Sequence, residues 1–242
     1  MSRLLDCVSV ANMRESDRAT IERYVPSLTL MYRAAMGVYR AADWRGEIAI
    51  AVGSGNNGGD GFALAYILKT NGVPCRVVAL SDKRSPDSAH FEAKAKAAGV
   101  SVEPYSEGAF RGCDIIVDCL LGTGFHGLLR EPCAAAIREI NASGAFVVSV
   151  DINSGMNGDT GTAALAVRSD LTVTIGFVKD GLVAEAAGAY MKRLAVADIG
   201  IVLDREERKL DPERREVCAD NVLPCPPWLD AGVIDTKDVS YS

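Results

Sequence analysis

The stretch that decides the fold is GSGNNGGDG, which runs from Gly53 to Gly61. It follows the apolar run EIAIAV and precedes the apolar-rich run FALAYILKT. Glycine in such numbers costs backbone entropy, so it usually marks unusual dihedrals or the close approach of another group to the backbone. A flexible connector is the alternative, but linkers do not usually lie abruptly between a strand and a helix. We therefore interpret the stretch as a functional turn between a strand and a helix.

Short valine- and isoleucine-rich runs recur along the chain and alternate with helical patterns. The runs show no polar alternation, which is typical of strands covered on both faces. We predict strands over residues 47–52, 75–80, 114–121, 146–152, 171–177 and 193–199. We predict helices over residues 10–24, 28–43, 61–70, 86–98, 131–142 and 181–192. The alternation predicts an α/β fold, a doubly wound Rossmann-like sheet in three layers (α/β/α) with an amino-terminal helical segment.

The composition of the chain changes beyond about Gly200. A charged run, DREERKLDPERREVCAD, is followed by the proline-rich run VLPCPPWLD. Such segments are typical of loosely attached termini. We therefore predict one domain over residues 1–203 and a charged, proline-rich tail over residues 204–242.

Composition and charge exclude several classes of protein. The 242 residues are 48% hydrophobic, which is enough for a sizeable core, and their net charge of −6 offers no basic patch for nucleic acid. No apolar run is long enough to span a bilayer, and the amino terminus becomes charged too early for a secretory signal. The seven cysteines form no CxxC pair, so we interpret them as reduced thiols. These features predict a cytoplasmic protein that binds neither nucleic acid nor membrane.

Three predicted strands end in loops rich in glycine and polar residues. The first loop is GSGNNGGDG, the second contains Asp118 and the turn Gly122–Gly124, and the third contains Asp151 and Ser154. Open α/β sheets bind ligands at the carboxyl edge of their strands, and a helix amino terminus there offers amide donors to a phosphate. The first loop has neither the GxGxxG spacing nor the lysine of a GxxxxGK loop, which disfavours a simple dehydrogenase or a nucleoside triphosphatase.

The same loops carry oxygen ligands. Asn57 offers an amide oxygen, Asp118 a carboxylate and Ser154 a hydroxyl, which is the mixed set that hard cations accept. Acids and serines also end strands simply as turn formers or helix caps. The residues alone leave both interpretations open.

The motifs GSGNNGGDG, VDCLLGTGFHG and VDINSGMNGDTG follow one another in this order and resemble the NAD(P)H-hydrate epimerase family, also called the YjeF amino-terminal domain. The resemblance covers roughly residues 8–199. It implies an isomerase that interconverts the C6 epimers of hydrated NADH and NADPH, so that a separate NAD(P)H-hydrate dehydratase can repair the cofactor. It also implies a potassium ion and a homodimer.

The resemblance assigns roles to particular residues. It implies that Asp151 lies beside the hydrated nicotinamide ring, where we expect it to act as the catalytic acid and base, and it implies Asn57, Asp118 and Ser154 as potassium ligands. It implies a substrate-binding set of Asn56, Asn57, Gly58, Gly59, Asp60, Gly122, Thr123, Gly124, Phe125, His126, Gly127, Leu128 and Asp151.

Some positions depart from the family pattern. Asn153 stands where the family has proline, which predicts a looser loop beside Ser154; Tyr32 stands where it has an acidic residue, and Asp180 where it has proline. These departures favour the alternative of a catalytically impaired scaffold or binding module. A nicotinamide-dependent oxidoreductase is a weaker alternative, because Asp82 lies near but not at the ribose-binding position. His126 is the rival catalytic base.

Overall fold

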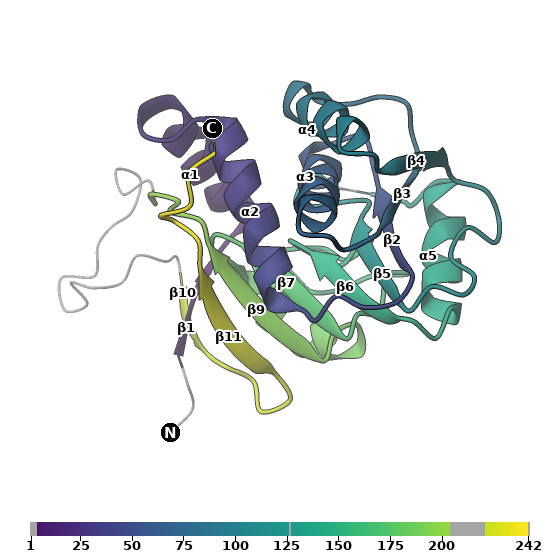
Figure 1. The fold of residues 1–242 in the computed structure, drawn as a ribbon. Coiled ribbons are helices and arrows are strands. Elements are labelled where there is room, and N and C mark those ends of the chain that lie inside the picture. The colour runs from purple at the N-terminus through teal and green to yellow at the C-terminus, as the bar shows by residue number, and fades with distance from the viewer. Residues whose placement is uncertain (1–3, 126, 204–220, 242) are drawn as a thin grey trace.

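The computed structural model describes residues 4–125, 127–203 and 221–241, and its centre is an eight-stranded sheet (Figure 1). The strand order is β11-β9-β7-β6-β5-β2-β3-β4, and all neighbouring strands run parallel. The strands are β2 (Ile48–Val52), β3 (Arg76–Ala79), β4 (Ser101–Pro104), β5 (Ile115–Cys119), β6 (Phe146–Val150), β7 (Leu171–Ile175), β9 (Arg193–Asp198) and β11 (Asp230–Asp235).

Helices cover both faces of this sheet, which confirms the predicted three-layer α/β/α fold. They are α1 (Val10–Arg23), α2 (Ser27–Ala41), α3 (Asn56–Thr70), α4 (Pro86–Ala97) and α5 (Cys133–Ala142). Helices α2, α3 and α4 lie on one face and α5 on the other (Figure 1). Alternate residues of β2 explain the two cores: Ile48, Ile50 and Val52 pack on the side of α2 and α3, and Ala49 and Ala51 on the side of α5.

The direction of winding reverses at β2. From β2 the chain goes outward through β3 and β4, then returns to place β5 on the other side of β2 and continues through β6, β7 and β9. Open α/β sheets bind ligands outside the carboxyl ends of the strands at such a switch point. The turn at Gly53 after β2 and the turn at Leu120 after β5 meet there, since Gly53 N donates to Cys119 O at 3.1 Å.

The carboxyl-terminal segment differs from the predicted loose tail. Residues 204–220 lie outside the described part of the chain, but β11 extends the main sheet beside β9. The strand β10 (Asn221–Pro224) pairs with β1 (Leu4–Val8), which pairs with the short β8 (Val178–Lys179). Tyr241 then packs on Tyr32, with ring centroids 5.0 Å apart. Residues 221–241 are therefore part of the fold, and the proline-rich composition hid two strands.

Two other predicted elements are different in the structure. The helix predicted over 181–192 is wrong: two short 3₁₀ helices, Asp180–Val183 and Glu185–Ala189, stand there. A Cβ on Gly181 would lie 2.6 Å from Gly161 N, so this segment is shaped by close backbone packing rather than by helix propensity. Helix α3 begins at Asn56, five residues earlier than the predicted 61, so NNGGD forms its first turn.

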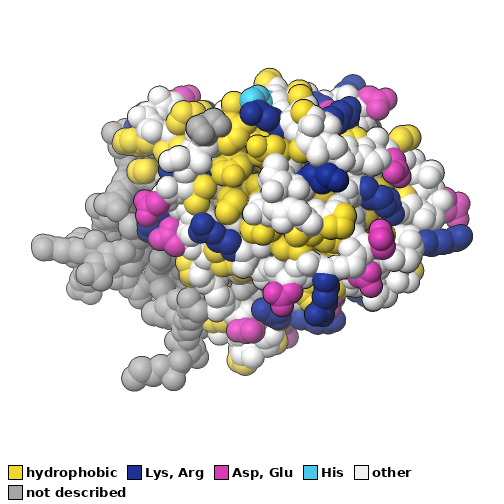
Figure 2. Space-filling model, viewed as in Figure 1, with side chains coloured by type: hydrophobic (Ala, Val, Ile, Leu, Met, Phe, Trp, Pro, Cys, Tyr) yellow, Lys and Arg dark blue, Asp and Glu magenta, His cyan; other side chains and the backbone are white. Residues whose placement is uncertain are grey.

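The surface agrees with the charge balance of the sequence. Lysine, arginine, aspartate and glutamate side chains are scattered over the face shown in Figure 2, and the cationic ones form no single patch there. Within residues 4–125, 127–203 and 221–241, none of the helices combines the length and the hydropathy needed to cross a bilayer.

Candidate active site

A cavity of about 630 Å³ opens at the switch point of the sheet. This volume lies within the usual range for small-molecule sites. Of the residues expected to bind substrate, eight line the cavity: Asn56, Asn57, Asp60, Gly122, Thr123, Gly124, Phe125 and Asp151. Leu128 is not among its lining residues and is 87% exposed. His126 lies outside the described residues.

Gly58 and Gly59, which the resemblance assigned to substrate binding, are not among the residues that line the cavity. Both are buried in α3. A Cβ on Gly58 would lie 2.4 Å from Gly53 O, and a Cβ on Gly59 would lie 2.6 Å from the Cε of Met31. These glycines therefore allow α3 to pack closely on the β2 turn and on α2.

Asp118 is fully buried at the end of β5 and bonds to the loop after β6. Its Oδ1 accepts from Ser154 Oγ at 2.5 Å, and its Oδ2 accepts from Ser154 N and from Ser149 Oγ, both at 2.9 Å. Burial raises the pKa of Asp118 above its usual value, while the hydrogen bonds from Ser154 and Ser149 oppose that rise. Asp118 thus fixes Ser154 in place.

Asn57 and Ser154 converge on the backbone of Leu121. Asn57 Nδ2 donates to Leu121 O at 2.8 Å, and Ser154 Oγ accepts from Leu121 N at 2.9 Å. The Oδ1 atom of Asn57 is buried and has no hydrogen-bond partner among the described residues. An unpaired buried carbonyl oxygen is costly. An amide oxygen with free lone pairs has the chemistry of a ligand for a hard cation.

Asp151 is the residue with the most unusual backbone at the site. Its φ is +68°, and it is the one non-glycine residue of the described chain with a positive φ. Such a conformation costs about 1–3 kcal/mol and concentrates at functional sites. Its Oδ2 accepts from Thr123 N at 3.3 Å, and its Oδ1 lies 2.5 Å from Lys179 Nζ. The carboxylate therefore faces the cavity between the glycine-rich turn and a lysine.

Sequence reasoning missed Lys179 as a site residue. It is 1% exposed and lines the cavity from β8. The one available signal was VKDGL, where a lysine directly follows an apolar strand and precedes a glycine. A lysine in such a position is more often exposed to solvent. The pairing of β8 with the distant β1 cannot be read from the local pattern, so nothing in the sequence indicated a buried lysine.

Three further carboxylates line the cavity from three helices: Asp17 on α1, Asp60 on α3 and Asp87 on α4. Burial raises the pKa of Asp60 well above its usual value, and the charges of Asp151 and Asp17 add to the rise. Burial also raises the pKa of Asp17, as does the charge of Asp151. Of these three residues, only Asp60 was expected at the site from the sequence. Asp17 lies one helical turn after the buried Met13, and this spacing could have indicated that Asp17 faces the same side of α1.

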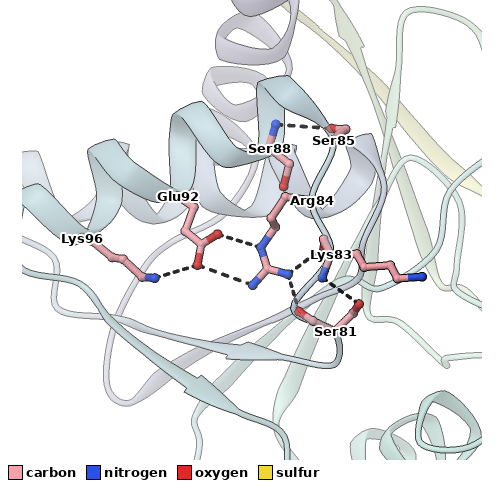
Figure 3. Close-up of polar contacts among 7 residues, drawn as sticks. All are labelled: Ser81, Lys83, Arg84, Ser85, Ser88, Glu92 and Lys96. Atoms are coloured by element: carbon pink, nitrogen blue, oxygen red, sulfur yellow. Dashed lines mark hydrogen bonds and ion pairs between the residues drawn. The ribbon is translucent and has the colours of Figure 1, made fainter.

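A polar network lies at the entry to α4 (Figure 3), and Asp87 stands in the first turn of this helix. Arg84 Nε donates to Glu92 Oε2 at 2.8 Å, and its guanidinium lies 5.0 Å from the ring centroid of Phe62. Ser85 caps the helix by accepting from Ser88 N at 3.3 Å. Neither Asp82 nor Arg84 is among the residues that line the cavity, whereas Asp87 is.

The departures from the family pattern do not loosen the site. Asn153 is fully buried: its Nδ2 donates to Val167 O at 3.0 Å and to Tyr190 O at 2.9 Å, and its Oδ1 accepts from Thr172 Oγ1 at 2.7 Å. The expected loosening of this loop is therefore wrong, because side-chain hydrogen bonds replace the fixed dihedral of proline. Tyr32 does not line the cavity; its ring stacks on Phe91 with centroids 6.4 Å apart.

A family model and two relatives of this chain point to the same family. Residues 27–181 match the family model described as YjeF-related protein N-terminus. The chain is 35% identical over 201 residues to an NAD(P)H-hydrate epimerase of Limosilactobacillus fermentum, with 79% of this chain and 95% of that protein covered. It is 36% identical over 216 residues to a bifunctional NAD(P)H-hydrate repair enzyme, Nnr, of Pyrobaculum aerophilum, with 84% of this chain but 43% of that protein covered.

A solved structure supports the fold. The crystal structure of yeast YNL200c superposes with a TM-score of 0.67 at 24% identity, covering 73% of this chain and 83% of that one. The chain thus spans nearly the whole length of the epimerase it resembles and less than half of the bifunctional enzyme.

Proposed function

The chain belongs to the family of the YjeF-related protein N-terminus, and from that premise we propose that it is an NAD(P)H-hydrate epimerase. In this proposal it interconverts the C6 epimers of hydrated NADH and NADPH. The observation that carries the proposal is Asp151, a carboxylate held at φ +68° in the wall of a cavity at the switch point of the sheet. This is where a proton donor and acceptor would meet the hydrated ring.

The chemistry needs one group that can both give and take a proton. C6 of the hydrate carries a hydroxyl beside the ring nitrogen, so either the C6–O bond or the C6–N bond can break and re-form on the opposite face. Asp151 serves either route: it protonates a departing hydroxyl and deprotonates incoming water, or it takes and returns the hydroxyl proton. General acid–base assistance of this kind is typically worth about 10²–10⁴-fold.

The dinucleotide would be held by backbone and neutral side chains. The turn Gly122–Phe125 and the first turn of α3 line the cavity with amide groups, and an anion at a helix amino terminus is favoured by the free N–H donors and the helix dipole. Asn56 extends from the same turn, as does Asp60, whose neutral form is favoured because burial raises the pKa of its carboxyl. We assign the pyrophosphate to these amides, because Asp17, Asp87 and Asp151 elsewhere in the cavity would repel it.

We further propose that potassium binds beside Asn57. Its unpartnered Oδ1, together with Ser154 Oγ and Asp118, supports this assignment. When bound, the cation would supply positive charge to position the anionic part of the ligand. Asp118 already accepts bonds on both oxygens, so its main part would be to hold Ser154 as a ligand.

We also propose that an NAD(P)H-hydrate dehydratase acts downstream of this protein. Relatives named as bifunctional NAD(P)H-hydrate repair enzymes, of which this chain covers 43% in the Pyrobaculum aerophilum protein, support a link between the two steps. A homodimer and a cytoplasmic location follow from the family resemblance and the composition alone.

The test is incubation of the protein with one purified NADPH-hydrate epimer, followed by chiral chromatography. An epimerase brings the mixture to equilibrium far faster than the spontaneous reaction. A parallel hydride-transfer assay with NADP⁺ tests the oxidoreductase alternative. Binding of the hydrate with no gain in epimerisation rate would instead identify an impaired scaffold.

A further inference from the structure

A carboxyl group that starts the reaction as an acid would have to be protonated. The ion pair between Lys179 and Asp151 is not explained by such a role, because it requires a carboxylate. Lys179 Nζ donates to Asp151 Oδ1 at 2.5 Å, to Ile175 O at 2.7 Å and to Thr174 Oγ1 at 3.0 Å. These three bonds use every donor of an ammonium group. A buried charge is tolerated when it is paired and fully hydrogen-bonded, so this geometry describes a charged lysine beside an ionised aspartate.

The same bonds fix the direction of the aspartate. Because Oδ1 is held by the lysine, Oδ2 is the oxygen with lone pairs available to a ligand, and it is positioned by Thr123 N at 3.3 Å. Asp151 keeps 14% of its side chain exposed, whereas Lys179 keeps 1%. The aspartate is the member of the pair that a ligand can reach.

The lysine is itself held from a distant part of the chain. It ends β8, where its backbone pairs with Val8 of β1, and β1 is flanked on its other side by β10. Its ammonium reaches back across the turn at Gly176, whose φ is +75°. Strands from both ends of the chain therefore support the position of one side chain in the cavity.

The cavity around the pair is rich in acidic residues. Asp17, Asp60 and Asp87 line it from α1, α3 and α4, and burial together with the charge of Asp151 raises the pKa of Asp17 and of Asp60. Among the described residues that line the cavity, the other cation is Arg14 on α1, whose guanidinium donates to Thr123 O. Lys179 is the cation in direct contact with Asp151.

We infer that Lys179 is a positioning residue that keeps Asp151 ionised and directs its Oδ2 at the ligand, so that the reaction begins with proton removal and proceeds by ring opening. This inference rests on the proposed epimerase function. Asp151 takes the proton of the C6 hydroxyl, the C6–N1 bond breaks, and its electron pair moves to N1 and into the adjoining carboxamide-bearing double bond. The C6–O bond becomes a carbonyl.

The cycle closes without a second reactant. Rotation about the C5–C6 bond presents the other face of the aldehyde to N1, which attacks C6 and re-forms the C6–N1 bond. The carbonyl oxygen becomes an alkoxide and recovers the proton from Asp151. The C6 oxygen is never exchanged with solvent in this route, whereas loss and re-addition of water would replace it at every inversion.

The first arm of the test follows that oxygen. The wild-type protein is incubated with one NADPH-hydrate epimer in H₂¹⁸O, and the ¹⁸O content of the newly formed epimer is measured by mass spectrometry against a protein-free control. We expect the inverted product to retain its original oxygen beyond the spontaneous exchange. One solvent oxygen per inversion would overturn the ring-opening route.

The second arm separates charge from position. Lys179→Met removes the ammonium and its three hydrogen bonds, so kcat should fall by about 10²-fold with a smaller change in KM. Lys179→Arg keeps the charge but not the three-bond geometry, so kcat should fall in this variant too, by less than in Lys179→Met. Lys192→Met removes an exposed lysine that also lies 2.5 Å from an aspartate, Asp170, and should change neither.

A third measurement does not need turnover. The ¹³C resonance of the Asp151 carboxyl carbon, assigned by its loss in Asp151→Asn, should move between the wild type and Lys179→Met at one fixed pH, because the variant lacks the ion pair. An inactive wild type with this change would refute the proposed function but not the role of Lys179. An active wild type with an unchanged resonance and an unchanged kcat in Lys179→Met would refute the inference. If Lys179→Met does not fold, an Arg variant with wild-type kcat would refute it.

Discussion

Gly58 and Gly55 of the motif GSGNNGGDG should respond differently to substitution by alanine. Gly58→Ala should lower stability, whereas Gly55→Ala should weaken ligand binding. A Cβ on Gly58 would lie 2.4 Å from Gly53 O and 3.2 Å from Gly53 N, whereas a Cβ on Gly55 meets nothing within 4 Å. Gly53 cannot move away cheaply, because its N–H donates to Cys119 O at 3.1 Å and a Cβ of its own would lie 2.0 Å from Leu120 O. Gly58→Ala should therefore push α3 away from the β2 turn.

The magnitude follows from two opposing effects. Alanine gains about 0.5–1 kcal/mol over glycine inside a helix, and overpacking costs typically about 1–3 kcal/mol. A contact of 2.4 Å with a backbone atom is at the severe end of overpacking, so we expect a net loss of about 2 kcal/mol, or roughly 4–8 °C in Tm.

Urea unfolding and calorimetric binding of the hydrate separate the two positions. Gly58→Ala should lower the unfolding midpoint. Gly55→Ala should change stability by no more than about 0.5 kcal/mol but weaken binding, because Gly55 lines the cavity and Gly58 does not. Equal stability of Gly58→Ala and wild type would refute the packing role that the structure gives this glycine.

Three other predictions follow from the site. Asn153→Ala should lose about 2–4 kcal/mol of unfolding free energy, because it breaks several buried hydrogen bonds and leaves their partners unsatisfied; a thermal melt like that of wild type would contradict this. Because the pKa of Asp60 is raised in the folded protein, ionisation of this carboxyl lowers the free energy of unfolding. The loss of stability grows as pH rises from the unfolded pKa of about 3.9 through the folded pKa. Asp60→Asn should accordingly raise the urea midpoint at pH 8 and leave it nearly unchanged at pH 4, and a larger gain at pH 4 would reverse the assigned sign. Asp118→Ala should raise the potassium concentration needed for half-maximal epimerisation more than Ser154→Ala does, and activity of the Asp118 variant at the wild-type level in both sodium and potassium buffers would exclude the cation site.

The sequence predicted the central sheet well because its signals are local. Each buried parallel strand is a short run of valine, isoleucine and alanine, and the glycine-rich motif lies between the first of these runs and its helix. The order of the three motifs also placed Asp151 near Gly122 and Thr123, which the structure brings together at one cavity.

The parts that sequence reasoning missed depend on distant pairing. β4 is mostly exposed and polar, so it lacks the apolar signal of the other strands. The segment Asp230–Asp235 has only weak strand character and becomes a strand by pairing with β9. Lys179 becomes a site residue through the pairing of β8 with β1, whose sequence positions are far apart. Asn153 was given the wrong physical reason, because its hydrogen-bond partners come from other segments of the chain.

The most direct test of the account is the rate of epimerisation by Asp151→Asn beside its hydrate affinity. Asparagine keeps the shape of the side chain but cannot carry the proton, so kcat should fall by about 10²-fold or more while affinity stays within a few-fold of wild type. Asp82→Asn, which lies outside the cavity wall, is the matched control and should behave as wild type. A nearly normal rate for Asp151→Asn, with the loss of turnover appearing in His126→Gln instead, would contradict the assignment of Asp151 as the acid–base group.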